Sequence, residues 1–182
     1  MFTVFSDNAL LYDPRLPEYV LTEPVLSLAK NEPARLSFGL PNTNPNIGSV
    51  ARLQSQIKVY RDETLVFLGR IIEDDVGLNH KQTYIAEGAL AYLLDSVQRP
   101  YSFDGSVAAL FTQLLTTHNA QVNVAQRLGV GNVTVEPDIT ITASSDEYTS
   151  VWAALKAQLI DVYGGYLVLT FDVDDLPVLN YL

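Results

Sequence analysis

The densest groups of chemically capable side chains are two short acidic runs, Glu73-Asp74-Asp75 and Asp172 with Asp174 and Asp175. Three carboxylates at this spacing are oxygen ligands of the kind that Ca²⁺ prefers, but an EF-hand loop beginning at Asp172 needs glycine at its sixth position, where Pro177 stands. Two carboxylates about 5–10 Å apart would suit a glycosidase. The sequence does not determine the distance between these carboxylates. Because acidic turns are common and the EF-hand pattern is absent, we expect both runs to be solvated turns that join strands.

The two histidines, His80 and His118, do not predict a catalytic or metal centre. His80 lies in a polar loop, and His118 ends a predicted helix, where its side chain suits the helix C-terminus. There is no His-Glu-x-x-His pair to hold zinc, and the absence of cysteine excludes thiolate sites. No serine lies in a nucleophile-elbow motif, and we expect neither histidine to pair with a serine. We therefore predict no catalytic, cofactor-binding or metal-binding residue, and no enzyme activity in this segment.

Three other features have structural explanations that outweigh functional ones. The glycine-rich turn Gly129-Val130-Gly131-Asn132 precedes a strand, so it cannot present helix N-terminal amides to phosphate. Trp152 lies on the apolar stripe of a helix, where we expect it to pack in the core. Several of the ten tyrosines, including Tyr60, Tyr84, Tyr101 and Tyr181, lie on polar sides or ends of strands; they suit either a protein interface or ordinary strand composition.

Composition bounds the function further. The 182 residues are 48% hydrophobic and carry 11 Lys and Arg against 21 Asp and Glu, a formal charge of −10. The basic residues are scattered, so specific nucleic-acid binding is not expected. No apolar run approaches the ~18–20 residues that cross a bilayer, and the opening residues lack the basic and hydrophobic blocks of a secretory leader. We expect synthesis in the cytoplasm and no membrane insertion by this segment.

The elements that must position these side chains are mostly strands in the first half. Alternation over 53–60, a nearly continuous apolar run over 65–72 that is bent or doubly buried near Gly69, and a third strand over 82–87 predict a three-stranded meander. Two earlier segments, 20–28 and 34–40, have the same character, and Pro24 favours an edge position for the first. The stretch 41–48 is a predicted loop, and 89–95 has the pattern of one or two helical turns.

The second half changes period. Apolar residues at helical spacing predict one helix near 106–118, capped by Asp104 or Ser106, and another near 146–163, capped by Ser144, Ser145 or Asp146 and ended by Gly164-Gly165. Short strands are expected at 133–135 and 139–142, and a hairpin at 166–171 and 178–182. The prediction is an α+β fold: a β-rich, barrel-like domain over 1–95 and an α+β domain over 96–182. Because the chain stops inside a strand, we expect it to be truncated at the C-terminus.

The order and spacing of several strings resemble one known family. They are Ile57-Lys58-Val59-Tyr60-Arg61-Asp62, Leu65 to Ile71, Ala86 to Ser96, Phe103 to Val107, Leu114-Leu115-Thr116-Thr117-His118-Asn119, Leu159-Ile160-Asp161 and Gly164-Gly165-Tyr166-Leu167. Together they are similar to the N-terminal hub region of phage tail-tip proteins, the tail-associated lysin or prophage tail endopeptidase family, which is related to the baseplate hub of contractile tails. The likeness covers roughly residues 53–182.

The resemblance implies a structural part of a virion. Hubs of this family have barrel-like tube domains and assemble as trimers that connect the tail tube or distal tail ring to fibre, spike or lysin elements. Peptidoglycan-degrading chemistry, where present, lies C-terminal to the hub, and no residue here matches a catalytic position. A negative charge suits a ring through which DNA passes, because a basic wall would retain phosphates. The alternatives are a carbohydrate- or host-receptor-binding module of the tail tip, or a small hydrolase.

Overall fold

The computed structural model describes residues 1–77 and 82–182 and divides the chain into two compact units, Met1–Ala89 and Leu90–Leu182. The sequence places the boundary after residue 95. In the structure the second unit begins earlier, at Leu90, because Leu90 and Leu93 of the 3-10 helix Ala89–Leu94 pack in its core. Each unit has its own core of buried apolar side chains, and the whole is an α+β fold, as the sequence predicts.

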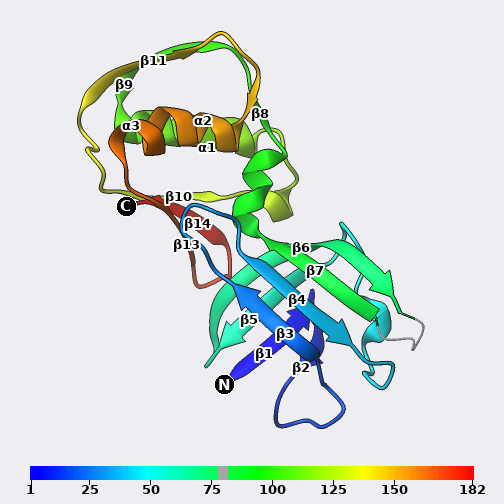
Figure 1. Cartoon of the computed structure of the whole chain (residues 1–182). Coiled ribbons are helices and arrows are strands. Elements are labelled where there is room, and N and C mark those ends of the chain that lie inside the picture. The colour runs from blue at the N-terminus through cyan, green and yellow to red at the C-terminus, as the bar shows by residue number, and fades with distance from the viewer. Residues whose placement is uncertain (78–81) are drawn as a thin grey trace. The chain divides into compact units, whose positions relative to one another are not determined.

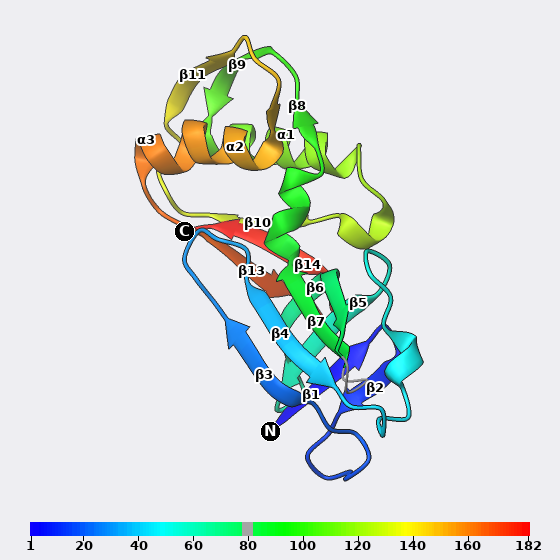
Figure 2. The same cartoon turned by 45° about the vertical axis from the view of Figure 1, so that its right-hand side comes forward.

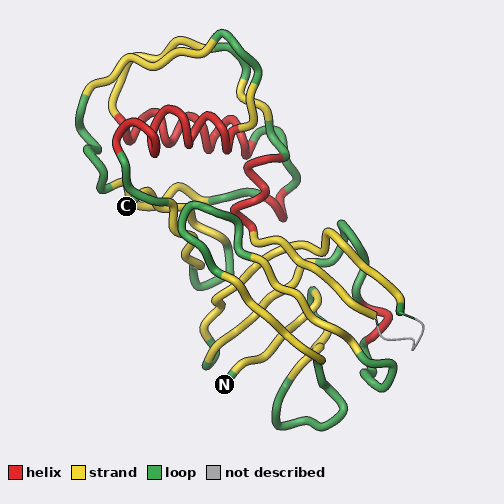
Figure 3. Tube along the Cα trace, in the orientation of Figure 1, coloured by secondary structure: helices red, strands yellow, loops and turns green. Residues whose placement is uncertain are grey.

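The first unit is a single curled antiparallel sheet of seven strands (Figures 1 and 3). Its spatial order is β2-β1-β5-β6-β7-β4-β3, so β2 and β3 are its edges and the sheet is an open half-barrel. The predicted meander is confirmed as β5-β6-β7, and the predicted edge position of Pro24 is confirmed in β3. The strands are β1 (Phe2–Ser6), β2 (Ala9–Tyr12), β3 (Thr22–Ser27), β4 (Arg35–Leu40), β5 (Gln56–Arg61), β6 (Thr64–Val76) and β7 (Gln82–Gly88), with a 3-10 turn at Ile47–Ser49.

Alternation explains the core of this sheet. Residues such as Ile57, Phe67 and Ile71 point to the concave side and are at most 2% exposed. Phe38 and Tyr84 stack there on adjacent strands, with ring centroids 5.4 Å apart. Tyr84 is therefore a core residue, so of the two explanations for its position, an interface or ordinary strand packing, the structure supports strand packing.

The acidic run Glu73-Asp74-Asp75 corrects the sequence prediction of a turn. Strand β6 continues to Val76, and these three residues pair with Ile85, Tyr84 and Thr83 of β7. A register shift between Ile71 and Glu73 marks a β-bulge, which bends the strand while the ladder goes on. The sequence suggests a turn at these residues because they are polar, and they are polar because this end of β6 is exposed to solvent.

The second unit packs two helical segments between two small sheets, a layering that Figures 1 and 2 both show. One layer is the ribbon β9–β11, and the other is the sheet β10-β14-β13, in which β10 runs parallel and β13 antiparallel to β14. A two-residue pair, β8–β12, flanks the helices. The elements are β8 (Val97–Gln98), β9 (Tyr101–Ser106), α1 (Val107–Asn119), a 3-10 turn (Val124–Gln126), β10 (Gly129–Val133), β11 (Thr140–Ser145), β12 (Thr149–Ser150), α2 (Val151–Leu155), a π-helical turn (Lys156–Ile160), α3 (Asp161–Tyr163), β13 (Leu167–Phe171) and β14 (Pro177–Tyr181).

Helix α1 confirms the first predicted helix. Ser106 is its N-cap, and its Oγ accepts a hydrogen bond from the backbone N–H of Ala109 at 3.2 Å. The predicted stripe is buried throughout, from Val107 to His118. Asp104, the other predicted cap, instead accepts a hydrogen bond from the hydroxyl of Thr142 on the paired strand β11, at 2.7 Å.

The second predicted helix begins later than expected. Residues 146–150 are not helical, because Thr149 and Ser150 form β12 against β8, and Ser150 Oγ accepts the N–H of Ala153 as the actual N-cap. Tyr148 is accordingly 71% exposed instead of lying on the apolar stripe. The helical segment contains a π-helical turn and ends at Tyr163. Its C-cap Gly164 has the positive φ predicted there, 76°, but its ψ of −148° lies outside the left-handed helical region, in a conformation that only glycine adopts readily.

The segment Gly129–Asn132 is also corrected, from a turn to strand β10. The backbone N–H of Asn132 donates to Oδ1 of Asn180 on β14 at 2.9 Å. A Cβ at Gly131 would overlap that same oxygen and lie 2.7 Å from Cγ of Asn180. Glycine is therefore present because two strands approach closely, and not because the chain turns.

Candidate functional site

The acidic residues after β13 form a structural turn. Oδ1 of Asp172 accepts the backbone N–H groups of Asp174 and Leu176, each at 2.9 Å, and the next strand begins at Pro177. This agrees with the predicted hairpin turn. Over residues 1–77 and 82–182, no group of three or more His, Cys, Asp or Glu side chains has the arrangement of a metal site.

Of the two histidines, His80 lies outside the described residues, and His118 is fully buried in the second unit. His118 Nδ1 is 2.8 Å from the hydroxyl oxygen of Ser96, and its Nε2 is 3.0 Å from the backbone oxygen of Gln126. Nε2 must carry the proton, since a carbonyl only accepts, so Ser96 donates to Nδ1. Burial lowers the pKa of His118, opposed by the Gln126 carbonyl and the charge of Asp95.

The Ser96–His118 pair corrects the expectation that no serine pairs with a histidine. Sequence reasoning missed it because the partners are 22 positions apart and belong to no motif. Both side chains are 0% exposed. A nucleophile needs access to its substrate, so the pair serves as an internal hydrogen-bond link between α1 and the segment before β8.

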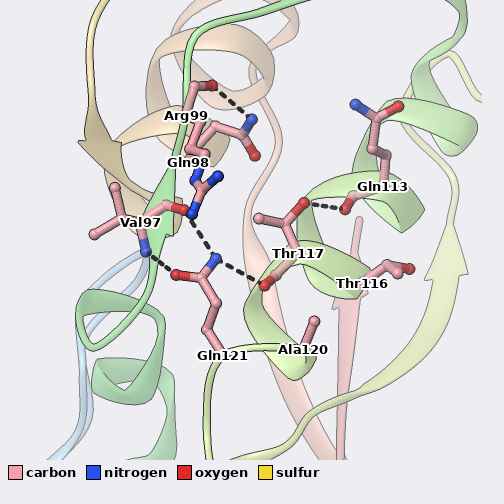
Figure 4. Close-up of a pocket in the computed structure, with 8 residues that line it drawn as sticks. All are labelled: Val97, Gln98, Arg99, Gln113, Thr116, Thr117, Ala120 and Gln121. Atoms are coloured by element: carbon pink, nitrogen blue, oxygen red, sulfur yellow. Dashed lines mark hydrogen bonds between the residues drawn. The ribbon is translucent and has the colours of Figure 1, made fainter.

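A groove lies beside the C-terminal half of α1, with a volume of about 610 Å³ (Figure 4). Its wall on one side is the segment 97–99, and on the other the face of α1 and the residues that follow it. The residues that line it are Val97, Gln98, Arg99, Gln113, Thr116, Thr117, Ala120 and Gln121. Most of these residues are glutamine or threonine, but the surface that they expose to the groove is more apolar than polar; Arg99 is the one charged side chain of the lining, and none is aromatic.

Gln121 holds the two walls of the groove together. Its Nε2 donates to the backbone oxygens of Val97 at 2.9 Å and Thr117 at 3.0 Å, and its Oε1 accepts the backbone N–H of Val97 at 3.0 Å. These three bonds are drawn in Figure 4. The arrangement gives a rigid, hydrogen-bonding groove without an acid, a base or a nucleophile in a pair, so it suits binding and not covalent chemistry.

The remaining aromatic residues belong mainly to the core. Trp152 packs against the core of the second unit, as predicted, and Tyr181 is fully buried. The hydroxyl of Tyr181 donates toward the backbone oxygens of Gly164 at 2.7 Å and Leu159 at 3.1 Å. Tyr60 and Tyr101 are half-buried. Among the described residues, no helix is long and apolar enough to span a bilayer.

Comparison with known proteins shows what this architecture is similar to. The sequence matches no family profile and no curated protein sequence. Solved structures do match. The prophage tail protein gp18 of Listeria monocytogenes EGD-e superposes with a TM-score of 0.60 at 14% identity, over 98% of this chain and 50% of that one. The 43 kDa tail protein of prophage MuSo2 from Shewanella oneidensis gives 0.59 at 14% identity, over 98% and 52%. A tail protein of Neisseria meningitidis MC58 gives 0.57 at 16% identity, over 81% and 41%.

The chain therefore has the fold of phage tail proteins, and this agrees with the family resemblance found in the sequence. The chain spans about half the length of these structures.

Proposed function

We propose that this chain is a structural hub component of a phage or prophage tail tip. Copies of it associate, as a trimer in the full-length protein, and connect the tail tube or distal tail protein to host-binding or lysin elements of the virion. The observation that carries the proposal is the fold, an open seven-stranded half-barrel followed by an α+β unit, which phage tail proteins share over nearly the whole chain.

The edge strand β3 offers a surface for a neighbouring copy. One side of β3 pairs with β4, and no strand within residues 1–77 and 82–182 pairs with its other side. Val25 and the nearby Leu28 are 55% and 68% exposed, large values for apolar side chains at a sheet edge. Pro24 and the register shift between Thr22 and Val25 limit further pairing at the start of β3, so the surface offered to a neighbour is the apolar end of the strand, which closed symmetric assembly would bury.

The charge supports a role around a DNA conduit. A formal charge of −10 disfavours contact with phosphates, so DNA passing through a ring of such subunits is not retained. We expect acidic side chains to be enriched on the inner surface of the assembled ring. An assembly whose lumen is basic would contradict this part of the proposal.

The oligomeric state of the full-length protein tests the proposal. We expect light scattering after size exclusion to give a trimer, and Val25→Lys at the β3 edge to shift it toward monomer. Val124→Lys is the matched control, because Val124 is 72% exposed in the other unit and lies outside the sheet edge. A full-length protein that is monomeric at every concentration, or a trimer that both variants leave intact, would count against the β3 edge as the interface.

The groove does not favour the receptor-binding alternative for a sugar ligand. Carbohydrate sites commonly stack a sugar on an aromatic ring, and the groove lining has none. A hydrolase would require a convergent acid, base or nucleophile, and the groove lining supplies only Arg99 as a charged group.

A further inference from the structure

A ring of three copies needs a contact between two different surfaces of the chain. If the β3 edge of one copy met the β3 edge of another, the contact would have a two-fold axis and would close as a dimer. In a cyclic trimer, β3 must instead meet a different surface of the next copy. An open strand edge is recognised through its main-chain N–H and C=O groups, so a second open edge is the natural partner.

The apolar end of β3 has main-chain groups that point away from β4. The N–H of Gly88 donates to the oxygen of Ala34 at 2.6 Å, which shows that Ala34 directs its main-chain groups toward β7. Alternate residues of a strand share this direction, so Leu36 also faces β7. Its partner in β3, Leu26, therefore turns its N–H and C=O to the open edge, and so does Leu28, two residues further on.

Strand β11 has an open edge of the same kind. The N–H of Val107 donates to the oxygen of Ile139 at 3.2 Å, in the register of the β9–β11 ladder, so Ile139 and Ile141 direct their main-chain groups toward β9. Thr140 and Thr142 therefore direct theirs away from β9. Both threonines are exposed, and no strand in the described part of the chain pairs with that side of β11.

The β11 edge lacks the features that usually block pairing, which are charged side chains, proline, glycine and bulges. Residues 139–145 contain none of these residue types, and the β9–β11 register has no shift. The other strands of the second unit that are longer than two residues and lie at a sheet edge are less suitable. β9 contains Asp104, β10 contains two glycines and a register shift, and Leu167 of β13 is 6% exposed and already has a partner.

We propose that β3 of one copy pairs with β11 of the next copy, an inference that rests on the proposed trimer. The pairing is antiparallel, the more stable arrangement for a short ladder. Leu26 lies opposite Thr142 and Leu28 opposite Thr140, and each pair exchanges two main-chain hydrogen bonds. This register leaves Ser144, whose oxygen accepts a side-chain hydrogen bond at 3.5 Å, outside the ladder. The first unit of each copy thus meets the second unit of the next, a head-to-tail contact that can close a ring.

Disulfide crosslinking in the full-length protein tests this register. Residues 1–182 contain no cysteine, so introduced thiols report their own neighbours. The Cα atoms of a hydrogen-bonded antiparallel pair are about 5.5 Å apart, within the range of about 4.4–6.8 Å that a disulfide spans. We expect the double variant Leu28→Cys/Thr140→Cys, after mild oxidation, to give a covalent trimer on a non-reducing gel. The matched control is Leu28→Cys/Ser102→Cys, because Ser102 is exposed on β9, the other strand of the ribbon. The control and each single variant should give no covalent trimer.

A second pair of variants tests the main-chain bonds. Thr142→Pro removes the outward N–H without breaking a main-chain bond within the chain, so light scattering should shift from trimer toward monomer. Thr142→Val keeps that N–H and should remain a trimer. Circular dichroism verifies that each variant is folded, and the crosslinking decides if Thr142→Pro is not.

The outcomes separate this pairing from the ring itself. A full-length protein that is trimeric by light scattering but gives no covalent trimer with Leu28→Cys/Thr140→Cys overturns the pairing and leaves the ring proposal standing. A covalent product that stops at the dimer also overturns the pairing, because a head-to-tail ring of three does not stop there. A full-length protein that is monomeric at every concentration overturns both proposals.

Discussion

Replacing Gly69 with alanine should destabilise the first unit strongly. Gly69 lies in β6 opposite Gly88 of β7. A Cβ at position 69 would overlap the backbone oxygen of Glu87 and lie 2.7 Å from Cζ of Phe67. That oxygen belongs to the paired strand, so the clash is relieved only by moving the two strands apart, not by rotating a side chain.

The magnitude follows from the type of contact. Overpacking a core usually costs about 1–3 kcal/mol, and we expect Gly69→Ala at the upper end, about 3 kcal/mol, because the obstacle is backbone. Gly48→Ala is the matched control: a Cβ there meets nothing within 4 Å, so its effect should stay within about 0.5 kcal/mol.

Urea denaturation followed by far-UV circular dichroism measures both changes. Trp152, the only tryptophan, lies in the second unit, so its fluorescence reports that unit separately. Equal midpoints for Gly69→Ala and Gly48→Ala would refute the reasoning, since it assigns the whole difference to the close approach of β6 and β7.

Three further predictions concern buried polar groups. Burial lowers the pKa of His118, so near and below pH 6.5, the usual pKa of histidine, the unfolded chain binds more protons than the folded one. The second unit should therefore keep its full stability above about pH 6.5 and lose stability as the pH falls below it. Denaturation followed by Trp152 fluorescence measures this pH dependence, and His118→Gln should reduce it. Asn44→Ala should cost about 1–3 kcal/mol in urea denaturation, because the buried Asn44 amide donates to the Leu11 oxygen at 2.8 Å; no loss would contradict this. Tyr181→Phe should cost about 1 kcal/mol in the second unit by leaving the Gly164 oxygen without its donor, and an unchanged melting temperature would argue against that bond.

The sequence predicts well those elements whose apolar period is uninterrupted. Helix α1, the terminal hairpin of β13 and β14, and the order of the meander β5-β6-β7 agree with their periods. The first strand of the meander is predicted to begin at Leu53, but β5 begins at Gln56, and Leu53 is 63% exposed with a positive φ. The cap at Ser106 and the break at Gly164 are equally local signals, and both are confirmed. Each depends on residues a few positions apart, which is why a single sequence suffices.

The errors arise where a distant partner decides the local structure. Glu73 continues a strand because β7 pairs with it, and Gly131 lies in a strand because Asn180 of β14 approaches it. The groove has the same origin. Gln121 and Val97 are 24 positions apart, and neither shows a pattern in sequence that would bring them together.

The most direct test of the central claim is cryo-electron microscopy of tails from a virion that carries the full-length protein. The account predicts density for the seven-stranded sheet in several copies around the tail axis at the tip, with β3 buried between subunits. Finding the protein absent from purified tails, or present as isolated copies on their periphery with β3 facing solvent, would contradict it.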